Sequence, residues 1–506
     1  MNIIVLMSDQ HRQDVLGCHS HPVVQTPNID GLARNGVIFD HAFCTSPLCM
    51  PSRGSFLTGT HPHTNGLVTL FNERHRSGKP YYPQRQPGIQ TLVTSLRDAG
   101  YQTHGAGYLG FHLFDGDTDL CYEHDFTGFE SYDAQDYPAI VGDQVAHAYH
   151  RGRIHSEMWE PSYHNVEGEP FPFEEEQMWD GIIAERCADF LENRRDPNRP
   201  FFLYAGFRAT HTPWRAPKRF HDLYDPNDIG SLPDYRTPPV DKPRRLIERF
   251  HYFDINHYPE ELVRRSIASY YGFVSYLDDC VGRIVNQLDR LGLREDTLIV
   301  YTSDHGENLF SHGLCEKHTF YESSVRIPLI FSMPSRLPSN TRSGSLAQIH
   351  DILPTVLSMA HINLPAQTEG CDLQPAFEGN PVRDHVLAEY YHTLDPSRMI
   401  RDHRYKYIHT EDDIDELYDL DNDPNEELNL AWYPQYADLV AEMEAKVMAG
   451  WEIPEVPLHG QWGDLNERKQ KQCLAGTPVV DTRPELPDWA KLPSFGKGES
   501  RRNEIR

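Results

Sequence analysis

Continuous apolar runs, each closed by polar residues, recur along the first two thirds of the chain. They occupy residues 2–7, 200–205, 297–302 and 327–331. Short apolar runs between polar loops are typical of strands that are buried on both faces of a sheet. We therefore expect these four segments to be strands of one central sheet, with the chain starting inside it.

Between these runs, apolar residues recur every three or four positions, which is the spacing of an amphipathic helix. The clearest example spans residues 261–291, where the apolar face consists of Ile267, Tyr271, Val274, Leu277, Val281, Ile284 and Leu288. Strands that alternate with helices predict an α/β fold in which helices sandwich a mixed, largely parallel sheet.

The pattern changes towards the C-terminus. Residues 404–409 alternate between apolar and polar positions like an exposed strand, and a helical pattern follows near residues 436–448. These elements predict a smaller C-terminal α+β subdomain at residues 376–450, after a main α/β domain at residues 1–375.

The last segment, residues 451–506, is rich in proline and charge and has little periodicity. Such a composition indicates an extended arm that either packs on another surface or is partly disordered. We hypothesise that this tail wraps a neighbouring subunit in a homo-oligomer.

Composition excludes several classes of protein. The 506 residues include 47 Lys and Arg against 75 Asp and Glu, a net charge of −28. A chain this acidic is repelled by nucleic-acid backbones and by anionic membrane surfaces, so we expect neither as a partner. No segment of the sequence approaches the roughly 18 apolar residues of a membrane span, and the N-terminus lacks a basic region before its short apolar run. We therefore expect a cytoplasmic protein.

The cysteines and the histidines allow two separate predictions. The nine cysteines are odd in number, widely spaced and include no Cys-x-x-Cys pair. This argues against a disulfide framework or a structural zinc site, so we expect reduced thiols. The 28 histidines, by contrast, indicate metal or proton-transfer chemistry.

Polar side chains follow two of the predicted strands. Asp9 and Gln10 follow the first run, and Asp304 and His305 follow the run at residues 297–302. Ligands of such sheets bind beyond the carboxyl ends of the strands, so we expect these residues to meet at one edge. Two carboxylates with an amide oxygen and an imidazole predict a site for one divalent cation. Ca²⁺ is the expected ion, and the imidazole also allows Mn²⁺. The alternative for a single Asp-Gln or Asp-His pair is a solvated turn.

The segment from Cys49 to Arg53 reads Cys-Met-Pro-Ser-Arg and marks a transition from loop to helix. Pro51 is expected at the first helical position. A helix N-terminus stabilises anions, and Arg53 adds a bidentate donor for an oxyanion. The alternative is a small buried thiol beside a helix start.

The Cys-x-Pro-Ser-Arg motif, followed by an apolar run and Thr58-Gly59, resembles the signature of the type I sulfatases within the alkaline-phosphatase superfamily. In that family, a maturation enzyme oxidises the cysteine to formylglycine. The resemblance extends from residue 2 to about residue 431 and includes Asp9-Gln10, Thr26-Pro27-Asn28, Thr210-His211-Thr212-Pro213, Ser303-Asp304-His305-Gly306-Glu307 and Lys317.

The resemblance implies an alkaline-phosphatase-like fold and a covalent mechanism. One hydroxyl of the hydrated formylglycine attacks sulfur and displaces the alcohol, and the other is deprotonated to expel sulfate. Arg53 is implied to orient the hydrate, Lys317 to bind the anionic group, and His211 to bind or protonate the leaving oxygen. The implied metal ligands are Asp9, Gln10, Asp304, His305 and the residue derived from Cys49.

One position departs from the family. Most sulfatases carry a lysine where this chain has Tyr108, so the site loses a cation but keeps one hydrogen-bond donor. The same replacement is similar to the phosphonate monoester hydrolase and phosphodiesterase branch. We therefore predict a hydrolase of small anionic sulfate esters, with a phosphonate monoester or phosphodiester hydrolase that uses the same residues as the alternative. A binding protein that keeps the fold without activity is the alternative from another class.

Overall fold

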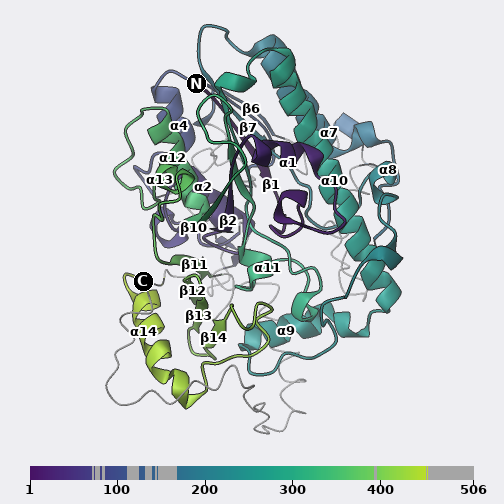
Figure 1. Ribbon diagram of the computed structural model, residues 1–506, viewed down its shortest axis with the longest axis vertical. Helices are drawn as coiled ribbons and strands as arrows, with labels where there is room; N and C mark the ends of the chain where they lie inside the picture. Colours follow the sequence, from purple (N-terminus) through teal and green to yellow (C-terminus); the bar gives the residue numbers. More distant parts are fainter. Residues whose placement is uncertain are drawn as a thin grey trace.

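The computed structural model describes residues 1–70, 86–110, 125–131, 168–391 and 396–451, with short stretches at 73–74, 80–81, 140–142, 145 and 453. A large sheet lies between two layers of helices, and a small sheet lies beside it near the C-terminus of the described chain (Figure 1). The predicted α/β class is confirmed.

The large sheet contains eight strands in the order β10-β2-β9-β8-β1-β7-β5-β6. Strand β9 runs antiparallel to both of its neighbours, and the other pairs are parallel. The strands are β1 (Asn2–Ser8), β2 (Gly36–Phe43), β5 (Gln102–Gly107), β6 (Gly128–Ser131), β7 (Phe201–Gly206), β8 (Thr297–Ser303), β9 (Leu329–Ser332) and β10 (Thr341–Gln348). A separate two-stranded pair consists of β3 (Glu73–Arg74) and β4 (Pro80–Tyr81).

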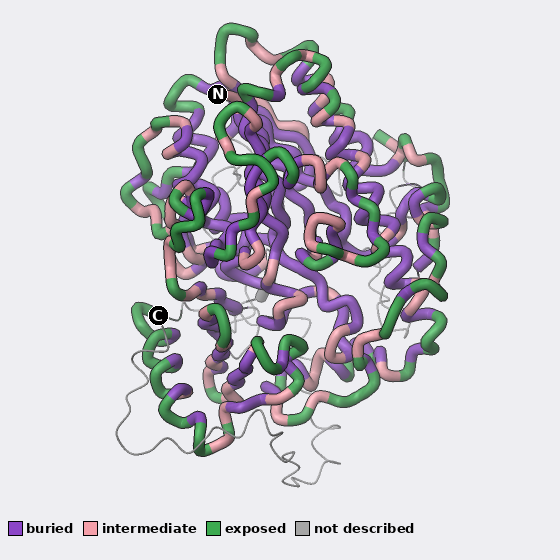
Figure 2. The backbone as a smooth tube through the Cα atoms, viewed as in Figure 1, coloured by how far each residue is buried: buried purple, intermediate pink, exposed green. Residues whose placement is uncertain are grey.

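Strand β1 lies at the centre because its side chains are apolar on both faces. Ile3 through Met7 are fully buried, as Figure 2 shows for the middle of the molecule. Its two neighbours, β7 and β8, run parallel to it, and Leu6 pairs with both Ala205 and Tyr301. The loops that follow these three strands therefore leave the sheet at the same edge.

Helices cover both faces of the large sheet (Figure 1). The longest, α10, runs from Glu260 to Arg290 and confirms the helix predicted at residues 261–291; it packs against α1, α7 and α8. The helices of this part are α1 (Pro27–Arg34), α2 (Cys49–Thr58), α3 (Pro62–Asn65), α4 (Leu92–Asp98), α7 (Trp179–Asp189), α8 (Lys218–His221), α9 (Arg244–Phe253), α10 (Glu260–Arg290), α11 (Glu322–Val325), α12 (Ile352–Met359) and α13 (Gln374–Phe377).

The small sheet is antiparallel and is covered on one face by a single helix. It contains β11 (Val386–Tyr390), β12 (Ser397–Arg401), β13 (Tyr405–Thr410) and β14 (Glu416–Asp419), and α14 (Ala437–Met448) packs on β12 and β13. The strand and the helix predicted at residues 404–409 and 436–448 are present, whereas the division into domains at residue 375 stays a prediction.

The expectation that residues 404–409 form an exposed strand was wrong. Tyr407 packs in a cluster with α14, whereas Ile408 belongs to the core around the large sheet, so both faces of β13 are covered. Even Lys406 is fully buried, and its Nζ lies 2.6 Å from Glu426 Oε1 and 2.8 Å from Glu322 Oε1. Pairing with carboxylates makes this burial of a cation tolerable.

Two further predictions can be compared with the described part of the chain. Its seven cysteines are all free thiols, while Cys121 and Cys473 lie outside it. None of its helices is long and apolar enough to cross a membrane. Nearly all of the predicted tail, from residue 454 onward, lies outside the described residues, and so does the oligomer contact predicted for it.

Candidate active site

Three loops meet at the carboxyl edge of the large sheet, after β1, β7 and β8. The backbone of Asp9 binds the β7 loop twice, with its N–H donating to Ala209 O (3.2 Å) and its carbonyl accepting from Thr210 N (2.8 Å). The Gln10 N–H donates to Asp304 Oδ1 at 3.0 Å. Residues from three distant parts of the chain are therefore fixed against one another at this edge.

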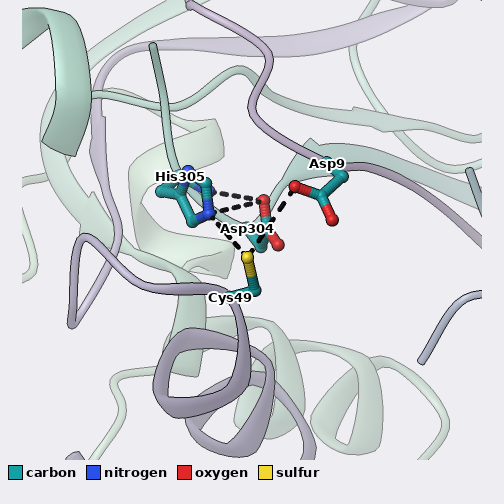
Figure 3. A group of neighbouring side chains, drawn as sticks. All are labelled: Asp9, Cys49, Asp304 and His305. Atoms are coloured by element: carbon teal, nitrogen blue, oxygen red, sulfur yellow. Dashed lines mark hydrogen bonds and ion pairs between the residues drawn. The ribbon is translucent and has the colours of Figure 1, made fainter. Parts of the chain in front are cut away.

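Four side chains converge where these loops meet the first turn of α2. Ligand atoms of Asp9, Cys49, Asp304 and His305 all lie within 4.8 Å of one another (Figure 3). Cys49 Sγ is 3.2 Å from His305 Nε2 and 3.8 Å from Asp9 Oδ1. All four residues are buried. The structure thus brings together the residues that the sequence placed at two strand ends and one helix start.

The donor set suits a divalent cation. Two carboxylates and an imidazole provide oxygen and nitrogen ligands, and Asp9 Oδ2 is a buried atom with no hydrogen-bond partner among the described residues. His305 Nδ1 lies 2.9 Å from Gly306 O, so donation by Nδ1–H leaves Nε2 directed at the cluster. The residues present therefore fit a metal ion.

The charge of His305 depends on this same environment. Burial lowers its pKa, but the charges of Asp304 and Cys49 outweigh burial and raise the pKa to about 9. A cation bound at Nε2 would replace that proton, because metal ligation requires a neutral imidazole.

Gln10 has a different set of contacts from the four-residue cluster. Its Oε1 accepts a hydrogen bond from Lys317 Nζ at 2.9 Å, and its Nε2 donates to Glu307 Oε2. The amide is therefore held between a cation and a carboxylate. Its predicted role as a metal ligand stays a prediction.

Helix α2 begins at Cys49, two residues earlier than expected. Leu48 precedes it in an extended conformation, and Pro51 lies within the first turn, where its missing N–H costs no intrahelical hydrogen bond. The expectation that Pro51 opens the helix was wrong. The thiol consequently lies at the first residue of the helix, facing the cluster.

Arg53 is fully buried, and protein oxygens surround its guanidinium. Its hydrogen bonds run to Asp304 Oδ2 (2.8 Å), Tyr108 O (2.9 Å), Tyr204 OH (2.9 Å) and Ser8 O (3.3 Å). Its Nη2 is also 3.6 Å from Asp9 Oδ2. Burial lowers the pKa of Arg53, but the charge of Asp304, together with Tyr204 and the charge of Asp9, outweighs burial and holds the pKa above its ordinary value. The positive charge of Arg53 therefore balances the two carboxylates of the cluster.

Lys317 and His211 form a buried pair at the same edge. Lys317 Nζ lies 2.7 Å from His211 Nε2, and His211 Nδ1 lies 2.7 Å from Thr212 O. If Nδ1–H donates to that carbonyl, Nε2 is the acceptor for the lysine. Only 4% of Lys317 and 2% of His211 are exposed, so their charge and orientation are set by the site.

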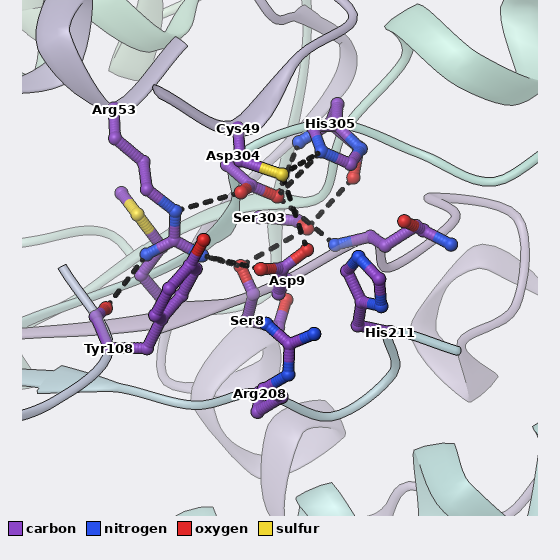
Figure 4. A network of polar contacts seen from close by, with 12 residues as sticks. Ser8, Asp9, Cys49, Arg53, Tyr108, Arg208, His211, Ser303, Asp304 and His305 are labelled. Atoms are coloured by element: carbon purple, nitrogen blue, oxygen red, sulfur yellow. Dashed lines mark hydrogen bonds and ion pairs between the residues drawn. The ribbon is translucent and has the colours of Figure 1, made fainter. Parts of the chain in front are cut away.

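Tyr108 lies beside two arginines, one of which the sequence analysis missed. Its ring centroid is 4.6 Å from the guanidinium carbon of Arg53 and 5.4 Å from that of Arg208 (Figure 4). Burial, with the charges of Cys49 and Asp9, raises the pKa of the Tyr108 phenol. Arg208 follows β7 in the loop that carries His211, so applying the strand-end rule to β7 would have found it.

A cavity of about 590 Å³ lies elsewhere on the molecule, between loops beside the large sheet and the small sheet. Its lining includes Arg12, Arg326 and Arg401 but none of the predicted site residues. Arg401 is already paired with Glu322 at 3.3 Å. We therefore assign the chemistry to the cluster around Cys49.

The fold and the buried cluster together define an α/β protein with a site that fits a divalent cation at the carboxyl edge of its large sheet. Comparison with family models identifies the family. The sulfatase model matches residues 1–362, and a model for the C-terminal region of N-sulphoglucosamine sulphohydrolase matches residues 310–451. The chain belongs to the sulfatase family and is an enzyme of the sulfuric ester hydrolase class.

Individual proteins agree with this assignment. An arylsulfatase from Clostridium perfringens is 27% identical over 467 residues, which cover 87% of this chain and 92% of the relative. A choline-sulfatase from Rhizobium meliloti is 30% identical over 453 residues, which cover 86% of this chain and 83% of the relative. The crystal structure of a phosphonate monoester hydrolase from Agrobacterium radiobacter superposes with a TM-score of 0.72 at 22% identity, and the match covers 96% of this chain and 99% of that one. This likeness confirms the alkaline-phosphatase-like fold.

Proposed function

We propose that this protein hydrolyses small sulfate esters through a formylglycine nucleophile derived from Cys49. The observation that carries the proposal is the position of Cys49 at the first residue of α2, inside a buried set of ligand atoms that span at most 4.8 Å. A thiol kept only for packing needs no carboxylates and imidazole around it. A formylglycine-generating maturation enzyme is the partner that this proposal requires.

One divalent cation would be held by Asp9, Asp304 and His305, with Gln10 and the modified Cys49 as further ligands. Ca²⁺ is the proposed ion, with Mn²⁺ as the alternative because an imidazole is present. When bound, such an ion acidifies a hydroxyl nucleophile and offsets negative charge on the ester oxygens.

The remaining residues bind the anionic substrate or maintain the charges of the site. Lys317 binds a non-bridging oxygen of the ester through its ammonium group, which already lies at hydrogen-bond distance from His211. His211 then binds or protonates the leaving oxygen. Its Nδ1–H is held by Thr212 O, so a proton passed on by Nε2 comes from Lys317 Nζ, which lies 2.7 Å from it. Arg53 keeps Asp304 ionised through the 2.8 Å contact between Nε and Oδ2.

Tyr108 supports a second candidate function, hydrolysis of phosphonate monoesters or phosphodiesters by the same residues. A neutral phenol at this position offers a hydrogen bond where a lysine would offer a full charge. The comparison of kcat/KM for an aryl sulfate and an aryl phosphonate monoester separates the two functions. A phosphonate preference of several orders of magnitude would reject the sulfate-ester assignment.

The nucleophile is tested by co-expressing the protein with a maturation enzyme and examining the Cys49 peptide by mass spectrometry. We expect formylglycine at this position and loss of turnover in Cys49→Ala, with the melting temperature largely retained. Cys187→Ala, which removes another fully buried thiol in α7, is the matched control and should stay active. Turnover by Cys49→Ala would reject the nucleophile, while an unmodified thiol without activity would favour a binding protein.

A further inference from the structure

A second buried cation lies beside the site, on the loop after β7. Only 4% of Arg208 is exposed. Figure 4 shows its side chain directed towards Asp9, and its guanidinium carbon is 5.4 Å from the ring centroid of Tyr108. Arg208 therefore brings positive charge to the mouth of the Cys49 cluster.

The backbone of Arg208 is held rigidly by α7 and by the neighbouring loop. Asp180 Oδ1, on a fully buried residue of α7, accepts hydrogen bonds from Arg208 N (2.7 Å) and Ala209 N (3.0 Å). The Arg208 carbonyl accepts from His211 N at 2.9 Å. One short segment thus presents both an arginine and the histidine proposed to protonate the leaving group.

The charges of the site show why this arginine matters. Asp9 and Asp304 repel an incoming anion, and the guanidinium of Arg53 is engaged by protein oxygens around these two carboxylates. Tyr108 adds no charge. Within the described part of the site, Lys317 and Arg208 are two further cations beside the cluster, and their positive charge attracts a substrate anion.

We propose that Arg208 binds the tetrahedral oxyanion group of the substrate, with its planar guanidinium facing two non-bridging oxygens. The inference rests on the proposed function and adds a specificity-determining residue to it. A guanidinium matches such an oxyanion with two parallel hydrogen bonds, which an ammonium group cannot provide. Arg208 thereby supplies the positive charge that Tyr108 does not.

The test compares Arg208→Gln and Arg208→Lys with the mature wild-type enzyme. Hydrogen bonds to charged groups contribute about 1.5–3 kcal/mol, so Arg208→Gln should lower kcat/KM for an aryl sulfate about 10- to 100-fold. We expect the loss mainly in KM, with Arg208→Lys recovering part of it. Calorimetric titration with inorganic sulfate should show a parallel loss of affinity.

Arg294→Gln is the matched control. Arg294 is also buried, at 9% exposure, but it precedes β8 and so lies at the opposite edge of the sheet, where it donates to Ser332 Oγ at 2.6 Å. This variant should keep the wild-type KM and sulfate affinity. Melting temperatures of the three variants show whether each is folded.

Unchanged KM and sulfate affinity in Arg208→Gln, or the absence of sulfate binding by the wild type, would overturn the inference. If Arg208→Gln does not fold, Arg208→Lys decides, because a purely structural charge would leave KM unchanged in that variant. A wild type that turns over neither ester, but binds sulfate in an Arg208-dependent manner, would reject the proposed function and support the oxyanion site.

Discussion

The 2.7 Å contact between Lys317 Nζ and His211 Nε2 joins two residues of the site into one unit. Lys317 also donates to Gln10 Oε1, so its ammonium group lies between a neutral imidazole and an amide oxygen that Glu307 orients. Groups linked in this way act together, because removing one partner changes the position and charge of the other.

We predict that Lys317→Met and His211→Ala each lower kcat/KM for an aryl sulfate about 10- to 100-fold through loss of a charged hydrogen bond. The double variant should lose less than the product of the two single losses, because both substitutions break the same contact. Steady-state kinetics of the four proteins measures this coupling, with the exposed Lys218→Met as the control. Strictly multiplicative losses would show that the two residues act independently.

Between elements, the ends of β5 and β7 approach so closely that only glycine fits. A Cβ on Gly206 would lie 2.0 Å from Tyr108 O, and Gly107 adopts a φ of 98°, which favours glycine. The close approach allows Tyr108 N to donate to Gly206 O at 2.8 Å. It also places the Tyr108 carbonyl 2.9 Å from Arg53 Nη1, so strand packing holds the arginine.

We predict that Gly206→Ala forces these strand ends apart, because the obstructing atom belongs to the backbone. Overpacking of this kind costs about 1–3 kcal/mol, and displacement of the Tyr108 carbonyl should remove most activity. Gly344→Ala in β10 is the control, because a Cβ there meets nothing within 4 Å. Thermal melting and kcat measurements check both variants, and a fully active Gly206→Ala would contradict this account of the site.

At the scale of the whole molecule, a buried carboxylate connects the helices beside the large sheet with the small sheet. Glu389 on β11 is fully buried, and its Oε1 lies 2.7 Å from His63 Nδ1 of α3 and 3.2 Å from Arg398 Nε of β12. Burial raises its pKa, but the hydrogen bond with His63 and the charges of the neighbouring His61, His63 and Arg398 outweigh burial and lower the pKa to about 2.

This shift predicts a loss of stability in acid. Because the pKa of Glu389 is lowered from 4.5, its stabilising contribution is complete above pH 4.5 and disappears as the pH falls towards about 2. The contribution is about 3 kcal/mol. Glu389→Gln should lower the melting temperature at pH 7, where it leaves Arg398 buried without its carboxylate, and flatten the decline of melting temperature between pH 4.5 and 2.

Scanning calorimetry across this pH range measures the effect. Glu260→Gln, at an exposed position of α10, is the control and should follow the wild type. A decline in Glu389→Gln that is as steep as in the wild type would assign the acid sensitivity to other groups.

The sequence by itself determined the central strands, the long helix, the C-terminal elements and the residues that cluster around Cys49. Strands β1, β7, β8 and β9 are visible in it because a strand buried on both faces must be continuously apolar. The meeting of Asp9 with Asp304 follows from the rule that ligand sites form beyond the ends of parallel strands. These features can be predicted because each depends on a short segment, namely an apolar run and the polar residues that follow it.

Only the tertiary structure decided which partners the charged residues take. It directs Arg53 to protein carboxylates, places Gln10 between Lys317 and Glu307, buries Lys406 in a strand whose two faces are covered, and adds Arg208 to the site. The physical reason is that burial and pairing depend on segments far apart in the chain. A charge in the sequence shows a need for a partner, and the packing of distant elements determines which partner meets it.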